Sequence, residues 1–364
     1  MSVATDLGIA FARVVFVMMF ILNLGGLLLW VERKQSAIMQ DRIGANRASI
    51  LGFRAFGLFH PIADAIKLLT KEDFRPARAD RFLFGLAPFV SVFFALVAFA
   101  SIPFGDTLYV AGREIPLQAV TLNVGVLYVF AMLSLGVYGV MMAGWSSANN
   151  YALLGGQRAA ALMISAEIAI GASIIGVIMV YGSLNLQEIV RGQGRYLLGG
   201  WLPAWGIVTQ LPAFVIFLTA GIAATKRIPF DTPECESEII GYFVEYSGMK
   251  AGMFMMADFL ETVVIAGMTT SLFLGGWQVP YLAAEGFRFP WGSVWTLPHL
   301  LVVLLQVGAF TVKVCVMIFL MMLVRWTLPR FRYDQAMRLG WLGLFPLSIL
   351  NIVFTGLLLL LWNP

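Results

Sequence analysis

The side chains best suited to chemistry in this chain are carboxylates in the segment that follows Lys226. Four of them are spaced 3, 4 and 7 residues apart, namely Asp231, Glu234, Glu238 and Glu245. If the segment forms one α-helix, these positions share a face of it, and Glu236 lies off that face. Carboxylates crowded on one face favour the protonated form, and burial favours it further. The pattern therefore predicts a cluster that takes up and releases protons near neutral pH.

A purely structural role explains the same acids. Asp231 is placed to cap a helix, with Pro233 in the first turn and Glu234 at the third position. Acidic side chains also suit the positive end of a helix dipole. A solvated acidic face, capped for helix stability, remains open beside the proton-binding interpretation.

Four further ionisable residues lie inside long apolar runs, namely Glu167, Asp258, Glu261 and Lys313. A charge near the centre of a bilayer costs at least ~3 kcal/mol, so such a residue must face a cavity or a partner. Glu167 is the best candidate for a proton relay, because it lies well inside its run. Asp258 and Glu261 are either relay groups or anchors near a membrane face. Lys313 is expected to pair with a carboxylate on another helix.

The elements that must position these residues are membrane helices. Of the 364 residues, 60% are hydrophobic and only 12% are charged, whereas soluble domains carry roughly 25% charged residues. Apolar runs of about 20 residues span a bilayer as helices, and these runs lack the alternation of a membrane barrel. We therefore predict an all-α polytopic membrane helix bundle, with residues 1–364 as a single membrane domain, and exclude a soluble enzyme. About eight transmembrane helices are expected, at residues 9–31, 82–102, 119–144, 160–181, 206–224, 252–274, 298–323 and 340–361.

The basic residues are distributed unevenly over the loops between these spans. The odd-numbered loops carry eighteen Lys and Arg residues, and the even-numbered loops carry four. By the positive-inside rule, this asymmetry places the odd loops in the cytoplasm and both termini outside. The same distribution argues against nucleic acid as a partner, despite the net charge of +4.

The first loop, residues 32–81, is too long and too patterned for a simple linker. Its apolar residues recur every three or four positions, at Phe53, Phe56, Phe59, Ile62, Ile66 and Leu69. This spacing predicts an amphipathic helix against the membrane or the bundle. Asp64 and Lys67, three residues apart, either pair on that helix or contact a docked subunit.

The chain offers few ligands for a cofactor of its own. It has two cysteines, Cys235 and Cys315, and two histidines, His60 and His299. This count excludes a four-cysteine iron–sulfur site and makes a self-contained zinc or haem site improbable. Neither a GxGxxG fingerprint nor a P-loop is present. Any redox cofactor is therefore expected on partner chains, and no metal is expected here.

Four long segments together indicate a family. They are ERKQSAIMQDRIGAN (32–46) with PIADAIKLLTKE (61–72), LLGGQRAAALMISAEI (153–168), KRIPFDTPECESEIIGYFVEYSG (226–248) and PRFRYDQAMRLGW (329–341). In this order, and with these spans, the chain resembles the membrane-embedded H-type component of bacterial respiratory NADH:quinone oxidoreductase (complex I), which is the counterpart of mitochondrial complex I subunit 1. The resemblance runs from the first span to the last.

The resemblance implies a role in the inner (plasma) membrane, where this family joins the other membrane subunits to the redox subunits of the peripheral arm. It implies quinone as substrate, lipids around the bundle, and FMN and iron–sulfur clusters on the partners, so that the chain is inactive alone. By motif position, the acid-lined proton path is implied to use Asp231, Glu234, Glu236, Glu238 and Glu245, with Glu167 deeper in the membrane. Residues near the quinone tunnel and its flanking loops are implied to be Arg33, Asp64, Arg227, Arg325 and Arg330.

The chain departs from the family pattern at Ala45, Ala166, Ala224, Lys226, Phe243 and Leu342. Two other functions stay open. A related hydrogenase or formate-linked complex uses a similar membrane anchor, although the intact PRFRYDQ segment and the full acid series favour the quinone enzyme. A stand-alone ion transporter is the second alternative, and the aromatic, basic first loop argues for a docking surface instead.

Overall fold

The computed structural model describes residues 3–110, 112–197, 200–233, 239 and 241–362. Within these residues, seven helices are long and apolar enough to cross a membrane. They contain α1 (Val3–Met39), α3 (Arg81–Ala98), α4 (Gly125–Ser146), α5 (Asn150–Tyr181), α9 (Gly248–Phe273), α10 (His299–Thr327) and α12 (Phe345–Trp362). The predicted all-α membrane bundle is confirmed. Each of these helices overlaps one of the expected spans.

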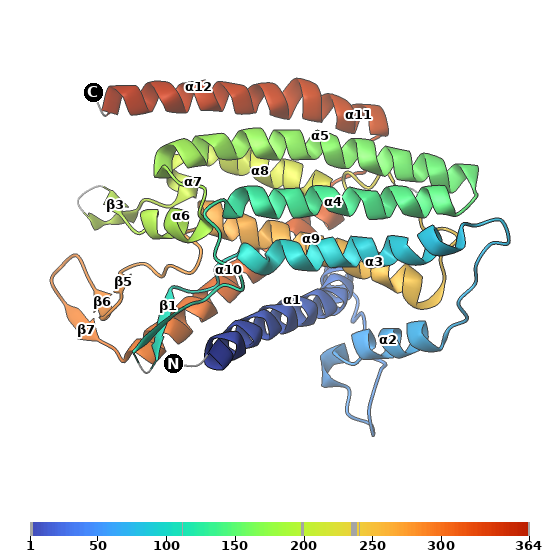
Figure 1. Cartoon of the computed structure of the whole chain (residues 1–364), viewed down its shortest axis with the longest axis horizontal. Coiled ribbons are helices and arrows are strands. Elements are labelled where there is room, and N and C mark those ends of the chain that lie inside the picture. Colours follow the sequence, from blue (N-terminus) through green and yellow to red (C-terminus); the bar gives the residue numbers. More distant parts are fainter. Residues whose placement is uncertain (1–2, 111, 198–199, 234–238, 240, 363–364) are drawn as a thin grey trace.

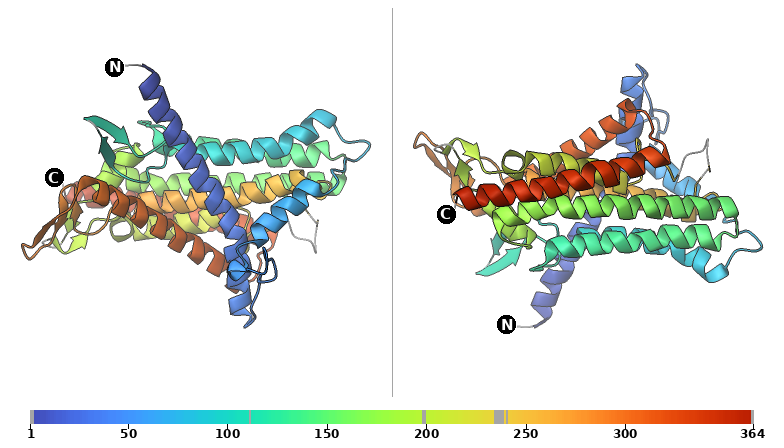
Figure 2. Two further views of the ribbon diagram at one scale, coloured as in Figure 1. Left: turned by 90° about the horizontal axis from the view of Figure 1, so that it is seen from below. Right: turned by 90° about the horizontal axis from the view of Figure 1, so that it is seen from above.

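Helix α9 forms the centre of the bundle. Every residue from Ala257 to Phe273 is buried, as expected for a helix that is apolar on all sides. Helices α3, α4 and α5 run side by side, with α12 against α5, while α1 and α10 lie on the other side of α9 (Figure 1). Helix α1 crosses the other helices obliquely (Figure 2).

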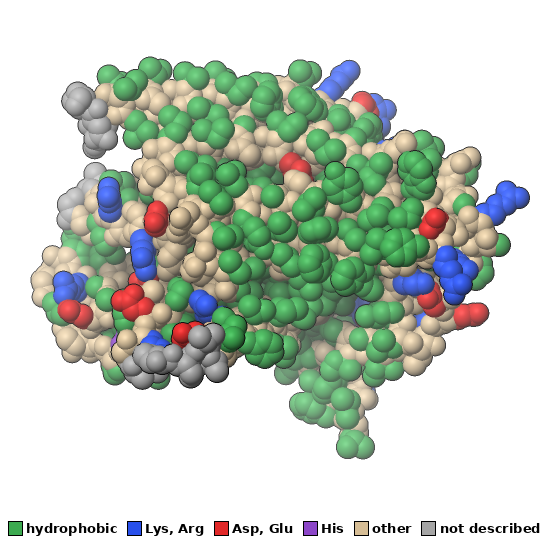
Figure 3. Space-filling model, viewed as in Figure 1, with side chains coloured by type: hydrophobic (Ala, Val, Ile, Leu, Met, Phe, Trp, Pro, Cys, Tyr) green, Lys and Arg blue, Asp and Glu red, His purple; other side chains and the backbone are tan. Residues whose placement is uncertain are grey.

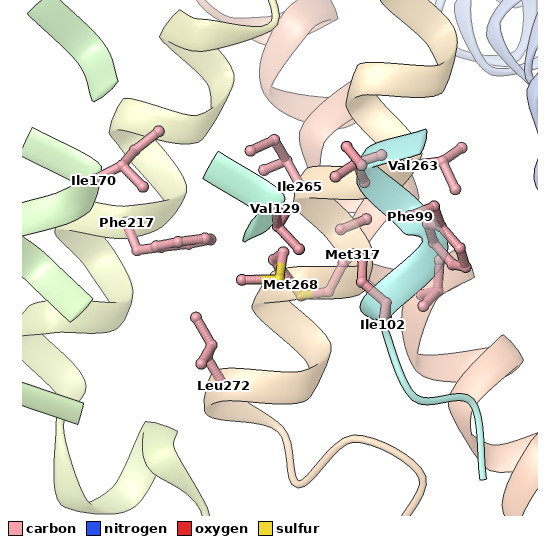
Figure 4. Packing of buried hydrophobic residues seen from close by; sticks show 14 of the residues in the cluster. Phe99, Ile102, Val129, Ile170, Phe217, Val263, Ile265, Met268, Leu272 and Met317 are labelled. Carbon is pink, nitrogen blue, oxygen red and sulfur yellow. The ribbon is translucent and has the colours of Figure 1, made fainter. Parts of the chain in front are cut away.

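The core consists of aromatic and branched side chains from several helices around α9. In Figure 4, Val263 and Met268 of α9 lie among Phe99, Val129 and Phe217, and all five are fully buried. Small residues allow the closest helix contacts, as is usual inside membranes. A Cβ at Gly139 of α4 would meet the Oγ atom of Ser91 at 2.2 Å, so α3 and α4 approach this closely only because residue 139 has no side chain.

The fifth expected span is two shorter helices, α7 (Gly206–Thr209) and α8 (Leu211–Ala224). Pro212 lies in the first turn of α8, where a missing N–H leaves no bond broken. The break exposes Gln210 to α12, and its amide donates to Thr355 at 2.9 Å and accepts from Asn351 at 2.9 Å. Fourteen residues of helix are about 21 Å long, so α8 is shorter than the ~30 Å core of a bilayer.

The loops gather at the two ends of the bundle. The odd loops lie at one end with α2 (His60–Thr70) and α11 (Tyr333–Arg338), which continues into α12 through the π-helical stretch η4 (Leu339–Leu344). The even loops lie at the other end with both termini (Figure 1). They include α6 (Leu186–Gly192) and antiparallel strands, namely β1 (Thr107–Val110) with β2 (Arg113–Pro116), β3 (Tyr196–Leu197) with β4 (Leu202–Pro203), and β5 (Leu282–Ala283), β6 (Gly286–Arg288) and β7 (Val294–Thr296) in one sheet.

The surface matches this arrangement. On the face shown in Figure 3, hydrophobic side chains cover the middle of the bundle, and most charged side chains lie toward its two ends. A belt of apolar side chains between polar ends is what a bilayer requires.

The first loop is helical over a shorter range than the sequence pattern predicts. Helix α2 includes Ile62, Ile66 and Leu69, but Phe53 and Phe56 precede it, the latter in the short 3-10 helix η1 (Ala55–Gly57). Gly57 has a φ of +90°, and a Cβ there would lie 2.0 Å from the carbonyl oxygen of Ala45, so the chain folds back on itself before α2.

The expected partner of Lys313 is wrong. Its ammonium donates to the carbonyl oxygens of Leu274, Gly276 and Gln278 at 2.7, 3.0 and 2.6 Å, and lies 4.2 Å from the centre of the Trp205 ring. The Leu274 carbonyl lies at the C-terminal end of α9, where the helix dipole is negative. Together with the carbonyls of Gly276 and Gln278, it compensates the ammonium charge in place of a carboxylate.

Candidate functional site

A cleft of about 370 Å³ opens at the end of the bundle that carries the odd loops, between α1, α9, α10 and the segment that follows α8. One part of its wall is apolar and consists of Leu29, Phe243, Met255, Phe259 and Trp326. The other part is polar and consists of Glu32, Arg33, Ser36, Arg227, Asp258 and Arg325. Apolar walls with a few placed polar groups are typical of small-molecule sites.

Glu32 holds two of the arginines at this cleft. Its carboxylate accepts from Arg325 at 2.5 Å and lies 3.6 Å from Arg227. The guanidinium of Arg227 also lies 4.2 Å from the centre of the Phe259 ring, a distance at which a cation is attracted to the ring face. The structure therefore brings Arg227 and Arg325 together around one carboxylate.

Arg33 and Asp64 form a separate pair beside the cleft. Their closest side-chain atoms are 2.6 Å apart, which ties α1 to α2. Asp64 therefore pairs with Arg33 of α1, whereas the sequence pattern left open a pair with Lys67 or a contact with a docked subunit. Because the two side chains are 42% and 30% exposed, the pair positions α2 more than it stabilises the fold.

The segment after α8 is not a helix in its described part. Residues 229–233 and 241–247 form turns and irregular chain, and α9 begins only at Gly248. The prediction of one helical face is therefore wrong for Asp231 and Glu245. Gly241 has a φ of +123°, which a right-handed helix excludes. Glu234, Glu236 and Glu238 lie outside the described residues.

Asp231 binds a guanidinium, and the turn that it was expected to cap includes residues outside the described part of the chain. Its carboxylate accepts from Arg330 at 2.8 Å. The backbone N–H of Phe331 donates to the carbonyl of Pro229 at 2.8 Å, so the fifth and seventh loops are joined twice. Burial raises the pKa of Asp231, and the guanidiniums of Arg330, Arg325 and Arg227 limit the rise. This carboxyl group is therefore suited to binding a proton closer to neutral pH than an ordinary aspartate.

Glu245 lies apart from the cleft. Its carboxylate accepts from the side-chain amide of Asn149, at 2.7 Å, near the turn between α4 and α5. The structure therefore separates Glu245 from the residues that line the cleft, whereas the sequence spacing places it with Asp231.

Glu167 faces a small cavity inside the bundle. Its carboxylate accepts from the hydroxyl of Ser134 at 2.7 Å. The cavity has a volume of about 20 Å³ and is also lined by Thr225 and Glu261. This volume is sufficient for one water molecule, and both carboxyl-bearing residues line it.

Asp258 and Glu261 lie between this small cavity and the cleft. Lys226 turns back into the bundle, and its ammonium is 2.7 Å from Asp258 and 3.5 Å from Glu261. The three side chains are 2%, 10% and 7% exposed, respectively. They are buried relay candidates rather than anchors near a membrane face.

A known protein family accounts for this chain. The family model described as NADH dehydrogenase matches residues 11–356. An NADH-quinone oxidoreductase component of Geobacter metallireducens, designated H 1, is 44% identical over 360 residues, which cover 99% of each chain. The component designated H of Thermomicrobium roseum is 45% identical over 340 residues, covering 93% of this chain and 92% of that protein. The component designated H 1 of Cytophaga hutchinsonii is 43% identical over 334 residues, covering 92% and 91%.

The chain belongs to the NADH dehydrogenase family. The resemblance to the H-type component of complex I that the four sequence segments indicate is confirmed.

Sequence reasoning missed three functional candidates in this NADH dehydrogenase family member. The sequence pattern presents Glu32 only as the first residue of a family segment and Lys226 only as a departure from the family, and it gives no prominence to Thr225. The sequence does contain a signal for Lys226. Asp258 and Glu261 lie three residues apart in an apolar run, so they require a nearby buried cation or bound protons. Among the described residues, no three His, Cys, Asp or Glu side chains are grouped so as to hold a metal ion.

Proposed function

We propose that this chain is a membrane subunit of a proton-translocating NADH:quinone oxidoreductase, and that its cleft admits the quinone. The names of its full-length relatives support the first part. The shape and lining of the cleft support the second part. The chain itself carries no redox centre in this proposal, so it catalyses nothing alone, and the FMN and iron–sulfur clusters belong to partner subunits.

The cleft suits the chemistry of a quinone. A quinone is a flat ring with two carbonyl acceptors and an apolar tail. Phe243, Phe259 and Trp326 supply apolar surface, and Arg227 and Arg325 supply donors. A volume of about 370 Å³ lies within the range of about 300–1,000 Å³ that is typical of ligand pockets.

Blocking the cleft tests this assignment. Ser36 lies in the cleft wall and is 6% exposed, whereas Ile38, two residues further along α1, is 74% exposed. We expect Ser36→Trp to reduce quinone-linked NADH oxidation by at least about tenfold, because an indole fills the space that the ring needs. Ile38→Trp is the matched control and should retain activity. Electron transfer from NADH to an artificial acceptor at the peripheral arm should persist in both variants. Normal quinone reduction by a fully assembled Ser36→Trp complex would contradict the proposal.

Proton coupling is the second part of the proposed function. Quinone reduction consumes protons and changes the charge at the cleft, which alters the proton affinity of carboxyl groups nearby. Asp231 and the acids at residues 234, 236 and 238 would share this titration, and Glu167 would receive the proton deeper in the bundle. The observation that supports it most directly is the water-sized cavity between Glu167 and Glu261.

Amide substitutions separate coupling from a structural role. Glu167→Gln, Glu234→Gln and Glu238→Gln remove a titrating proton and nearly keep the shape. Quinone-linked turnover and proton pumping should fall together in each variant. Glu114→Gln, in strand β2 at the far end of the bundle, is the control and should pump normally. If the variants at 167, 234 and 238 all assemble and pump like the unmodified complex, the acids have only a structural role.

Docking and orientation belong to the same proposal. Loop one exposes Leu51, Phe53 and Phe56 beside dense positive charge, and apolar side chains of this kind are usually covered by a partner. We propose that the redox subunits of the peripheral arm cover them on the cytoplasmic side of the plasma membrane, and that lipids and other complex I membrane subunits cover the apolar belt. Hydrogen exchange in loop one should slow when the arm is attached, and equal exchange with and without the arm would count against docking.

A further inference from the structure

The cluster of Lys226, Asp258 and Glu261 has a feature that the proposed function does not explain. A lysine ammonium is buried between two acids, with a side chain that is only 2% exposed. The backbone of Lys226 has a φ of +54°, a conformation that residues other than glycine rarely adopt. This conformation stands at the point where the chain leaves α8 and turns back toward α9.

The cluster connects two cavities. Asp258 lines the cleft, and Glu261 lines the water-sized cavity that also contains Glu167. The Lys226 ammonium lies within 2.7 Å of Asp258 and 3.5 Å of Glu261, so it joins the acid at one space to the acid at the other. Thr225, the preceding residue, lines the small cavity and a neighbouring cavity next to Arg227.

Charge balance determines how many protons this cluster can hold. Desolvation of an unbalanced buried charge costs several kcal/mol, so a buried cluster favours a net charge of zero. Burial opposes the charge of Lys226, but Asp258 and Glu261 outweigh it and raise its pKa well above the ordinary value, so the lysine stays charged. One cation and two carboxyl groups are neutral when the acids share a single proton. Without the cation, neutrality would require two protons.

The surrounding groups include one cation more than carboxylates, but this excess lies at the cleft, where the Arg227 and Arg325 side chains are 17% and 21% exposed and water screens their charge. Arg227 and Arg325 face Glu32, and Asp231 faces Arg330. Among the residues that the structure describes, the other titratable groups that face the cluster are Tyr242, whose ring centre is 5.8 Å from the Lys226 ammonium, and Glu167 across the small cavity.

We infer that Lys226 is a positioning residue that limits the Asp258–Glu261 pair to one shared proton and holds that proton between the cleft and Glu167. This inference rests on the proposed function. In the transfer step, the O–H bond of the Glu261 carboxyl group breaks, the proton crosses the water-sized cavity, and an O–H bond forms on the Glu167 carboxylate. The pair then carries one negative charge more and regains a proton at Asp258 from the cleft side.

Infrared spectroscopy of the purified complex tests the proton count, because protonated carboxyl groups absorb separately from carboxylates. Lys226→Met should add one protonated carboxyl group per chain at neutral pH, and Lys226→Met combined with Glu261→Gln should return to the original number. Glu261→Gln alone should lose one, because the lysine then balances Asp258 without a proton. Lys226→Arg keeps the charge and should leave the number unchanged. Lys250→Met is the matched control, because Lys250 pairs with Asp73 at 2.7 Å but is 30% exposed.

Two readouts distinguish this inference from the proposed function. The carboxyl count needs no quinone turnover, so an unchanged count in both Lys226→Met and Glu261→Gln would overturn the inference. The pH profile of quinone-linked pumping should move to higher pH in Lys226→Met but not in Lys226→Arg or Lys250→Met. If the count changes as expected while pumping is normal in Lys226→Met and in Glu167→Gln, the proton count stands and the coupling route is wrong. If Lys226→Met does not assemble, the loss of one carboxyl group in Glu261→Gln still decides the inference.

Discussion

The pair of Asp231 and Arg330 predicts an unequal response to the removal of its two partners. Arg330→Gln leaves Asp231, whose side chain is 11% exposed, without its nearest cation. A hydrogen bond to a charged group contributes about 1.5–3 kcal/mol when buried and about 0–1 kcal/mol when exposed. Because the Arg330 side chain is 36% exposed, we take about 1.5 kcal/mol as the cost of Arg330→Gln. This cost corresponds to roughly a tenfold increase in the equilibrium constant for opening the two loops.

Asp231→Asn should have a much smaller effect. Burial raises the pKa of Asp231 in spite of the guanidiniums of Arg330, Arg325 and Arg227. The net effect of its surroundings therefore disfavours the charged form, and a neutral amide of the same shape avoids that cost. We expect a change within about 0.5 kcal/mol, because the amide keeps the shape and avoids the desolvation cost of a buried charge. In the Asp231→Asn background, Arg330→Gln should then add little, so the coupling energy of the pair is about 1.5 kcal/mol.

The raised pKa also sets the direction of the pH dependence. The closed loops bind a proton more tightly than the opened ones, in which Asp231 has an ordinary pKa of about 3.9. The contribution of Asp231 to loop closure is therefore fully present below about pH 4 and is lost as the pH rises through the raised pKa of the closed state. Asp231→Asn should remove this pH dependence.

The backbone N–H of Phe331 provides the assay, because it donates to the carbonyl of Pro229 across the two loops. Its hydrogen exchange, corrected for the intrinsic effect of pH, gives the free energy of local opening. The cycle needs the unmodified complex, both single variants and the double variant. The reasoning is refuted if Asp231→Asn opens the loops as much as Arg330→Gln does, or if the coupling energy is below about 0.5 kcal/mol.

Three further predictions concern other contacts. Lys313→Met removes a cation from three carbonyl oxygens at 2.6–3.0 Å. It should lower the free energy of unfolding by about 2–4 kcal/mol, because each charge-assisted bond contributes about 1.5–3 kcal/mol and the contributions are not additive. Thermal denaturation in nanodiscs measures this loss, and an unchanged midpoint would contradict the prediction. Arg325→Lys should reduce quinone-linked turnover more than Arg332→Lys, because an ammonium cannot replace the two-pronged guanidinium. Arg325 pairs with Glu32 and its side chain is 21% exposed, whereas the Arg332 side chain is 71% exposed. Equal activity of the two variants would argue against a role of Arg325 at the cleft. In a cysteine-free background, Gly192→Cys should react with an impermeant thiol reagent in intact cells and Asp334→Cys should not, and the opposite pattern would reverse the proposed topology.

The sequence was sufficient for the class of protein, and three of the residues that the resemblance implied lie together in the structure. Long apolar runs identified the membrane helices, because span length depends on local composition alone. Arg33, Arg227 and Arg325 were expected near one site, and all three line the cleft. The single helical face predicted for Asp231 and Glu245 failed, because spacing shows which residues share a face only if the whole segment is helical. Gly241, with its φ of +123°, interrupts any helix before Glu245.

The amino-acid sequence by itself determined that this chain is a membrane bundle of the NADH dehydrogenase family with ionisable residues inside its spans. Only the tertiary structure decided which of those residues meet. Lys226 binds Asp258 and Glu261, Asp231 binds Arg330, and Lys313 binds backbone carbonyls instead of an acid. The physical reason is that burial dictates that a charge must be compensated, whereas the partner depends on how helices far apart in the sequence pack together.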